Sequence, residues 1–125
     1  MRVIVCGGRD FRNRLWLYAG LDRLHELNPI TQVIEGGAEG ADRFGGEWAR
    51  RNGVQLITVP ANWRAYGKKA GYLRNVQMAD MVPDMVLAAP GGAGTQMMIS
   101  IAQQRGIPVA LLHKMDVLRS AEPAE

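Results

Sequence analysis

Three short glycine-rich stretches are the part of this sequence whose composition and spacing suggest chemistry. They read VIVCGGRD at residues 3–10, VIEGGAEGAD at residues 33–42 and VLAAPGGAGT at residues 86–95. In each stretch an apolar run ends in a glycine pair, and a helical pattern follows. We call residues 7–8, 36–40 and 91–94 the first, second and third glycine turns.

The chemistry that these turns suggest is the binding of an anion. Glycine allows tight turns and lets a ligand approach the backbone without meeting a Cβ atom. A helix that starts after such a turn offers free N–H groups and a partial positive charge, which suit phosphate. For any single turn, a tight connection between strand and helix explains the glycines equally well. Three such turns in 125 residues favour a shared phosphate site.

Two familiar nucleotide-binding motifs are missing from the sequence. It contains neither GxGxxG nor GxxxxGK followed by Ser or Thr. The ordinary dinucleotide fingerprint and the Walker A loop are therefore excluded.

Polar residues beside the turns are further candidates. Arg9 could grip a phosphate through two hydrogen bonds. The Asp10 carboxylate could accept from ribose hydroxyls or could cap a helix, and Asp42 has the same two alternatives, with the cap favoured. Thr95 lies where a helix N-cap is expected, and its hydroxyl could also touch phosphate.

The segment PANWRAYGKKAGYLRN, residues 60–75, is predicted to be a long connection without regular structure. Such connections are often binding loops or lids. Trp63 could stack on a base, or it could be a half-buried packing residue. Arg74 and Asn75 could reach phosphate and ribose, although a surface arginine is the simpler interpretation. The full set of candidate ligand-binding residues is Gly7, Gly8, Arg9, Asp10, Gly36, Gly37, Gly40, Asp42, Trp63, Arg74, Asn75, Gly91, Gly92, Gly94 and Thr95.

The elements that must position these residues alternate along the chain. Continuous apolar runs without clean alternation are typical of strands buried on both faces, as in a parallel sheet. Helical spacing of apolar residues lies between the runs, which predicts a single α/β domain. The predicted strands are Arg2–Cys6, Gln32–Glu35, Val54–Val59, Met85–Ala89 and Pro108–Leu112. The predicted apolar stripes of the helices are Leu17, Leu21, Leu24 and Leu27; Ala41, Phe44 and Trp48; Leu73, Val76 and Ala79; and Met98, Ile101 and Ala102.

Composition limits the remaining possibilities. The length fits one domain, expected over residues 1–114, followed by a polar tail over residues 115–125 whose end, SAEPAE, is expected to fray. The net charge of +3 favours anionic partners, but its cations are scattered and form no dense patch of the kind that binds nucleic acid. No apolar run approaches about 20 residues and no signal peptide is recognisable, so we expect a cytoplasmic protein without a membrane span.

The sequence gives little support for a metal site or for a nucleophilic cysteine. The single cysteine, Cys6, ends an apolar run and is expected to be a buried, inert thiol. His25 and His113 have no metal-ligand spacing, so no metal site is expected. No catalytic residue and no cofactor can be assigned from the residues.

Five motifs together resemble one family. GGRDF, EGGAEGADRFGGEWA, VPANW, AGYLRNVQM and PGGAGT are similar to the YspA-like group of the SLOG superfamily, across about residues 2 to 112. That superfamily also contains the LOG cytokinin-activating proteins and the DprA/Smf proteins. The resemblance implies a Rossmann-like, three-layer domain with a five-stranded parallel sheet in the order 3-2-1-4-5. It also implies a nucleotide, NAD or ADP-ribose-like ligand above the glycine turns, and a homodimer.

One departure from the LOG pattern bears on catalysis. LOG enzymes carry a catalytic glutamate three residues after PGGxGT, where this sequence has Met98. The phosphate-binding glycines are kept and the acid is missing, so the resemblance favours a sensor or sponge for a nucleotide-derived molecule over an enzyme. Two alternatives stay open: a nucleoside-monophosphate N-glycoside hydrolase whose acid is Asp10, Glu39 or Asp42, and DprA/Smf-like binding of nucleic acid.

Overall fold

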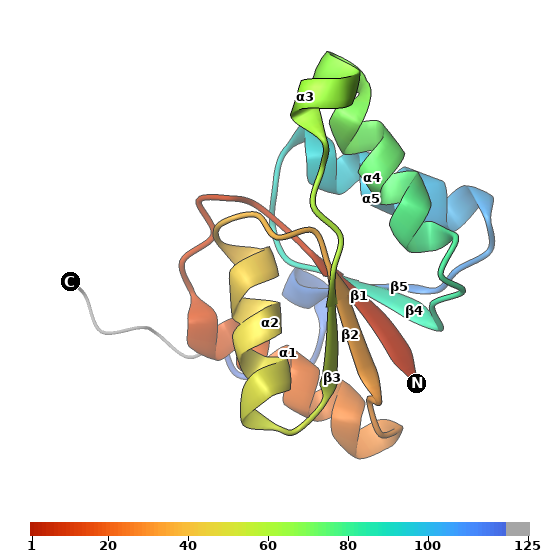
Figure 1. Cartoon of the computed structure of the whole chain (residues 1–125). Coiled ribbons are helices and arrows are strands. Elements are labelled where there is room, and N and C mark those ends of the chain that lie inside the picture. The colour runs from red at the N-terminus through yellow and green to blue at the C-terminus, as the bar shows by residue number, and fades with distance from the viewer. Residues whose placement is uncertain (120–125) are drawn as a thin grey trace.

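The structure, a computed structural model, describes residues 1–119 and is built on a parallel sheet (Figure 1). Its strands are β1 (Arg2–Cys6), β2 (Gln32–Glu35), β3 (Gln55–Thr58), β4 (Met85–Ala88) and β5 (Val109–Leu111). The sheet order is β3-β2-β1-β4-β5, and every pairing is parallel. The predicted fold class and strand order are confirmed, with three strands one or two residues shorter than predicted. The fraying expected for SAEPAE lies outside the described residues.

Four longer helices cover the two faces of this sheet. Helices α1 (Arg14–Leu27) and α2 (Ala41–Arg51) pack together on one face, while α4 (Ala70–Ala79) and α5 (Ala93–Gln104) pack together on the other (Figure 1). This is the three-layer arrangement expected of right-handed βαβ connections. No helix in residues 1–119 is long and apolar enough to cross a membrane.

The core consists of two apolar layers, one on each face of the sheet. Along β1, Val3 and Val5 pack toward α1 and α2, whereas Ile4 and Cys6 pack toward α4 and α5. Successive side chains of a strand point to opposite faces. Because both faces are covered, both sets must be apolar, which explains why the strand sequences do not alternate.

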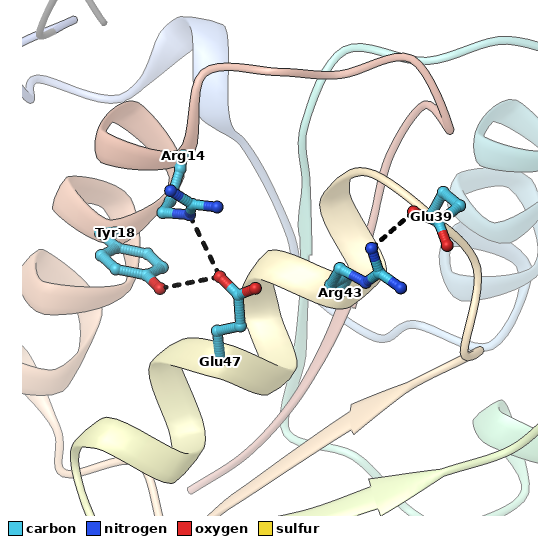
Figure 2. A network of polar contacts seen from close by, with 5 residues as sticks. All are labelled: Arg14, Tyr18, Glu39, Arg43 and Glu47. Atoms are coloured by element: carbon cyan, nitrogen blue, oxygen red, sulfur yellow. Dashed lines mark hydrogen bonds and ion pairs between the residues drawn. The ribbon is translucent and has the colours of Figure 1, made fainter.

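Polar contacts join α1 to α2, the helix that follows the second glycine turn. Glu47 of α2 accepts hydrogen bonds from Arg14 Nε at 3.1 Å and from the Tyr18 hydroxyl at 3.2 Å (Figure 2). Burial, followed by the neighbouring Glu47 carboxylate, raises the pKa of Tyr18. Deeper in the interface, Trp48 Nε1 donates to Asp22 at 2.8 Å. The helix pair is therefore held by directional contacts as well as by apolar packing.

Residues 60–75 differ from the prediction of an irregular connection, and residues 70–75 already belong to α4. The segment before them contains a short helix, α3 (Trp63–Tyr66), and a 3₁₀ turn (Gly67–Lys69) that leads directly into α4. The Asn62 side chain caps α3 by accepting from Ala65 N at 3.0 Å. Gly67, with a φ of 55°, ends the helix. We call residues 62–69 the arm, because all of them are exposed and α3 stands beyond the end of α4 (Figure 1).

Two residues of the predicted helical stripes are also misplaced: Leu73 of α4 is 38% exposed, and Leu27 lies at the end of α1. Leu27 was expected on the buried face of α1, yet it is the last residue of that helix and is 67% exposed. Leu17, Leu21 and Leu24 are buried as predicted.

Candidate functional site

The three glycine turns meet at the carboxyl edge of the sheet. They follow β1, β2 and β4, which are neighbours in the sheet order. The first turn lies between the other two and forms backbone hydrogen bonds with the chain segment on each side of it. Gly8 N donates to Pro90 O at 2.8 Å, and Gly8 O accepts from Ala41 N at 3.2 Å. The turns therefore form one continuous structure, at the position where ligands bind in open α/β sheets.

Some of the glycines are required by the packing of the turns themselves. A Cβ atom on Gly7 would lie 2.6 Å from the Cβ of Ala41. Gly40 has a φ of +75°, and a Cβ there would lie 2.3 Å from Gly8 O. A Cβ on Gly91 would lie 2.2 Å from the Thr95 hydroxyl oxygen. At these three positions packing requires glycine, which agrees with the interpretation that the glycines form tight connections between strand and helix.

Two glycines of the third turn have no such explanation. A Cβ atom on Gly92 or Gly94 would meet no protein atom within 4 Å. Neither residue has a positive φ, and that of Gly92 is −97°. Both line a cavity at the N-terminus of α5. The missing side chains leave open the space in front of the free N–H groups of this helix.

This cavity, which we call the main cavity, has a volume of about 440 Å³. Pockets for small ligands usually have about 300–1,000 Å³. A smaller cavity of about 350 Å³ adjoins it and shares Arg9, Trp63 and Arg74 with it. The predicted residues that line the main cavity are Gly7, Gly8, Arg9, Asp10, Asp42, Trp63, Arg74, Asn75, Gly92, Gly94 and Thr95; Gly36 and Gly37 line the smaller one, whereas Gly40 and Gly91 line neither.

Two residues of α4 connect the second turn to the third across the main cavity. Arg74 Nη1 donates to Gly36 O at 2.7 Å, and Arg74 Nε donates to Asn75 Oδ1 at 3.2 Å. Asn75, which is 5% exposed, donates from Nδ2 to Gly94 O at 3.3 Å. Arg74 is therefore tied to the turns and is not a free surface arginine.

Asp42 is the buried acid of the main cavity. It is 7% exposed, and its carboxylate accepts from Ala38 N at 3.2 Å. Burial is the largest influence on its pKa, which rises from an ordinary value of 3.8 to about 6. The prediction that Asp42 caps α2 is wrong. The N-cap position is Gly40, and the Asp42 side chain instead holds the loop that precedes the helix.

Two other predicted caps also differ from the structure. Helix α5 begins at Ala93 with Gly92 at the N-cap position, so Thr95 lies inside the first turn and is 5% exposed. Asp10 does not cap α1, because Asn13 does so by accepting from Trp16 N at 3.1 Å. In both cases the helix starts at a different residue from the one that local preference suggests.

Sequence reasoning missed Glu35, the last residue of β2. It is 4% exposed and accepts hydrogen bonds from Gly37 N and, at 2.5 Å, from the Thr58 hydroxyl. Its carboxylate therefore holds Gly37 of the second turn in place. An acid at the end of an otherwise apolar strand was the available signal. Lys68, Tyr72 and Met97 also line the main cavity without having been predicted.

The position that corresponds to the LOG glutamate does not face the main cavity. Met98 is 1% exposed and packs in the apolar layer that contains Ile4 and Met78. Its neighbour Met97 lines the cavity instead.

Cys6 is buried as predicted, and burial raises the pKa of its thiol to about 12. In residues 1–119, no group of three or more His, Cys, Asp or Glu side chains is placed to hold a metal ion.

Comparison with known proteins places these features in context. A family model described as "YspA, cpYpsA-related SLOG family" matches residues 1–66, which contain the first and second glycine turns. The Gene 61 protein of Mycobacterium phage D29 is 38% identical over 116 residues, which cover 86% of this chain and 93% of the phage protein. The name of the phage protein specifies no ligand or activity.

Proposed function

We propose that this chain, which belongs to the YspA, cpYpsA-related SLOG family, binds a phosphate-bearing, nucleotide-derived small molecule in the main cavity. The observation that carries the proposal is that neither packing nor a positive φ requires glycine at Gly92 and Gly94. They leave open the N-terminus of α5, a helix of 12 residues. Free N–H groups and the helix dipole at such an end favour a phosphate group.

Charged and aromatic side chains around the main cavity support the same ligand class. Arg9 and Lys68 line it and could balance the charge of a phosphate. Trp63 and Tyr72, each 50% exposed, offer ring faces on which a base could stack. A nucleotide combines both requirements in one molecule, as do NAD and ADP-ribose.

The first experiment is a thermal-shift screen with nucleotides, NAD, ADP-ribose and inorganic pyrophosphate. A ligand at 100 times its dissociation constant stabilises the native state by about 2.7 kcal/mol. A shift of several degrees is expected for a domain of this size. If no compound in the panel shifts the melting temperature, the proposal is wrong.

A matched pair of variants locates the ligand. Gly92→Val places a branched side chain in the open space, so the protein should fold and lose the ligand-dependent shift. Ser100→Val places the same side chain at an exposed position of α5 outside the described cavities, and it should keep the shift. Equal shifts in both variants would show that the third turn does not hold the ligand.

The binding function would be that of a sensor or a sponge. The similarity to a phage protein favours a sponge that sequesters a host signalling nucleotide. In that case the ligand must survive contact with the protein. Recovering the intact molecule after incubation with the protein would support sequestration.

Hydrolysis of a nucleoside monophosphate is the second candidate, because Asp10 and Asp42 both line the main cavity. Cleavage of an N-glycosidic bond needs a carboxylic acid or carboxylate near the sugar. Chromatography of AMP, NAD and ADP-ribose after incubation distinguishes the two functions. Turnover of about 1 per second or faster would favour the enzyme.

Nucleic-acid binding is the least supported alternative. Four cations, Arg64, Lys68, Lys69 and Arg74, belong to the arm and α4, but the net charge of the whole chain is only +3. Binding to a polyanion falls steeply with salt concentration. A gel shift that is absent at moderate salt, with nucleotide binding retained, would fit the small-molecule function.

A further inference from the structure

We propose that Asp42 and Arg74 recognise the ribose hydroxyls of the ligand, so that the main cavity selects ribonucleotides over 2′-deoxyribonucleotides. This inference rests on the proposed function and adds a specificity to it. It assigns the sugar to the second glycine turn and the phosphate to the third.

The two side chains approach one point above the second turn. A Cβ atom on Gly36 would lie 2.1 Å from Arg74 Nη1 and 2.9 Å from Asp42 Oδ2. Both residues also line the main cavity. The glycine therefore leaves room for a carboxylate and a guanidinium that face the same space from α2 and α4.

A neutral polyol suits this pair better than a charged group does. Arg74 would repel a cation and Asp42 would repel an anion, whereas a hydroxyl can donate to the carboxylate and accept from the guanidinium. Adjacent ribose hydroxyls supply two such groups. A 2′-deoxyribose lacks one of them and would leave a buried acceptor without that partner.

Both side chains keep hydrogen-bonding capacity beyond the contacts they make within the protein. A carboxylate has about four acceptor positions. That of Asp42 accepts from Ala38 N. A guanidinium has five N–H donors, and that of Arg74 donates to Gly36 O and Asn75 Oδ1. The internal contacts fix the orientation of the pair, as recognition of a small ligand requires.

The order of the strands places the two subsites at a suitable separation. Asp42 follows β2, the open glycines follow β4, and β1 lies between them. Neighbouring strands are about 4.8 Å apart, so the strand ends that lead to the two subsites lie about 10 Å apart. A ribose 5′-phosphate, with its phosphate at one end and its hydroxyls at the other, matches this arrangement.

The test measures dissociation constants by calorimetry for matched pairs: AMP, GMP, CMP and UMP, each against its 2′-deoxy counterpart, at pH 8. The parent protein should bind the preferred ribonucleotide at least about tenfold more tightly than its deoxy form, the size expected for one hydrogen bond to a charged group. Asp42→Asn should reduce this ratio to about twofold or less, because deoxynucleotide binding, which has only the 3′-hydroxyl to lose, weakens less than ribonucleotide binding. Asp80→Asn changes an exposed acid that pairs with Arg105 outside the described cavities, and it should leave the ratio unchanged.

A pH series adds a readout that a purely structural Asp42 would not give. The ribose preference of the parent should weaken as the pH falls from 8 to 5, because a protonated Asp42 loses acceptor capacity. The preference of Asp42→Asn should not change with pH. The ligand phosphate titrates in the same range, but its effect cancels in the ratio of two nucleotides. The ionisable groups near Asp42 are Cys6 on β1, Glu35 on β2 and Arg74 on α4, with Arg9, Asp10, Lys68 and Tyr72 along the same cavity.

Each outcome decides between the two proposals. Equal affinity for both members of every pair would overturn the ribose inference and leave the phosphate site intact. A ratio that Asp42→Asn does not reduce would also overturn it. Failure of all eight nucleotides to bind would remove this inference, and failure of the wider ligand panel as well would remove the proposed function.

Discussion

At the scale of the residue, Gly94 is a position where stability and binding should oppose each other. It lies in the first turn of α5, where alanine is favoured over glycine by about 0.5–1 kcal/mol. No protein atom lies within 4 Å of a Cβ at this position. Gly94→Ala should therefore raise the melting temperature of the unliganded protein by about 2 °C and weaken ligand binding.

Ser100→Ala is the matched control for that prediction. It also increases helix propensity in α5, at an exposed position outside the described cavities. Calorimetry and thermal melts of both variants should show a similar gain in stability, with loss of affinity confined to Gly94→Ala. Unchanged affinity in Gly94→Ala would remove this glycine from the ligand site.

Asp42 should make the stability of the fold depend on pH. Because its folded-state pKa is raised to about 6, the folded protein holds the proton more tightly than the unfolded chain does. Ionisation as the pH rises from about 4 to 6 therefore weakens the fold. Asp42→Asn should be more stable than the parent at pH 8 by about 1–3 kcal/mol, with the difference fading toward pH 4.

Urea denaturation of both proteins across this pH range measures the effect. Other ionisable groups contribute equally to both proteins, so the difference between the two curves isolates Asp42. A difference that stays constant from pH 8 to pH 4 would show that the carboxylate does not titrate as its burial requires.

The residue types predicted which residues lie together at the site, but they did not predict the role of each residue there. The sequence shows Gly7, Gly40, Gly92 and Gly94 as the same residue, although a Cβ on either of the first two would clash with a neighbouring chain segment and the last two face open space. That difference depends on contacts between segments far apart in the chain. The same reason explains why Asp42 was assigned to a cap and why Glu35 was overlooked.

At the scale of the element, the arm should contribute to binding and little to stability. All of residues 62–69 are exposed, and α3 has only four residues. Trp63 lines both adjoining cavities. Trp63→Ala should melt within about 1–2 °C of the parent and should bind nucleotides about tenfold more weakly, because stacking on a base contributes about 1–3 kcal/mol.

Tyr66→Ala separates stacking from a general effect on the arm. Tyr66 is 56% exposed on the same short helix, yet it lines a different cavity. Its replacement should leave nucleotide affinity unchanged, and pyrophosphate, which has no base, should bind both variants equally. If both variants lose nucleotide affinity to the same extent, Trp63 does not act by stacking.

The regular elements could be predicted because each strand is a short apolar run and each long helix has one apolar stripe. The arm could not be predicted in this way, since α3 is one turn long and has no buried residue. Periodicity identifies elements through the face they bury. An element that buries nothing leaves no such pattern, and only Asn62 and Gly67 mark its ends.

At the scale of the whole molecule, the resemblance leads us to propose a homodimer. Sedimentation equilibrium at micromolar concentration should give twice the chain mass of 13.7 kDa. A single species at the chain mass over this range would contradict the proposal. The measurement should be repeated with ligand, because binding to one assembly state shifts the equilibrium toward that state.

The three glycine turns also have a consequence for how relatives of this protein could diverge. A side chain at Gly7, Gly40 or Gly91 would clash with a neighbouring segment, so substitutions there would destabilise the fold. Substitutions at Gly92 or Gly94 meet no such barrier, because nothing packs against them. If the third turn holds the ligand as proposed, these two positions are where relatives could change ligand without changing the scaffold.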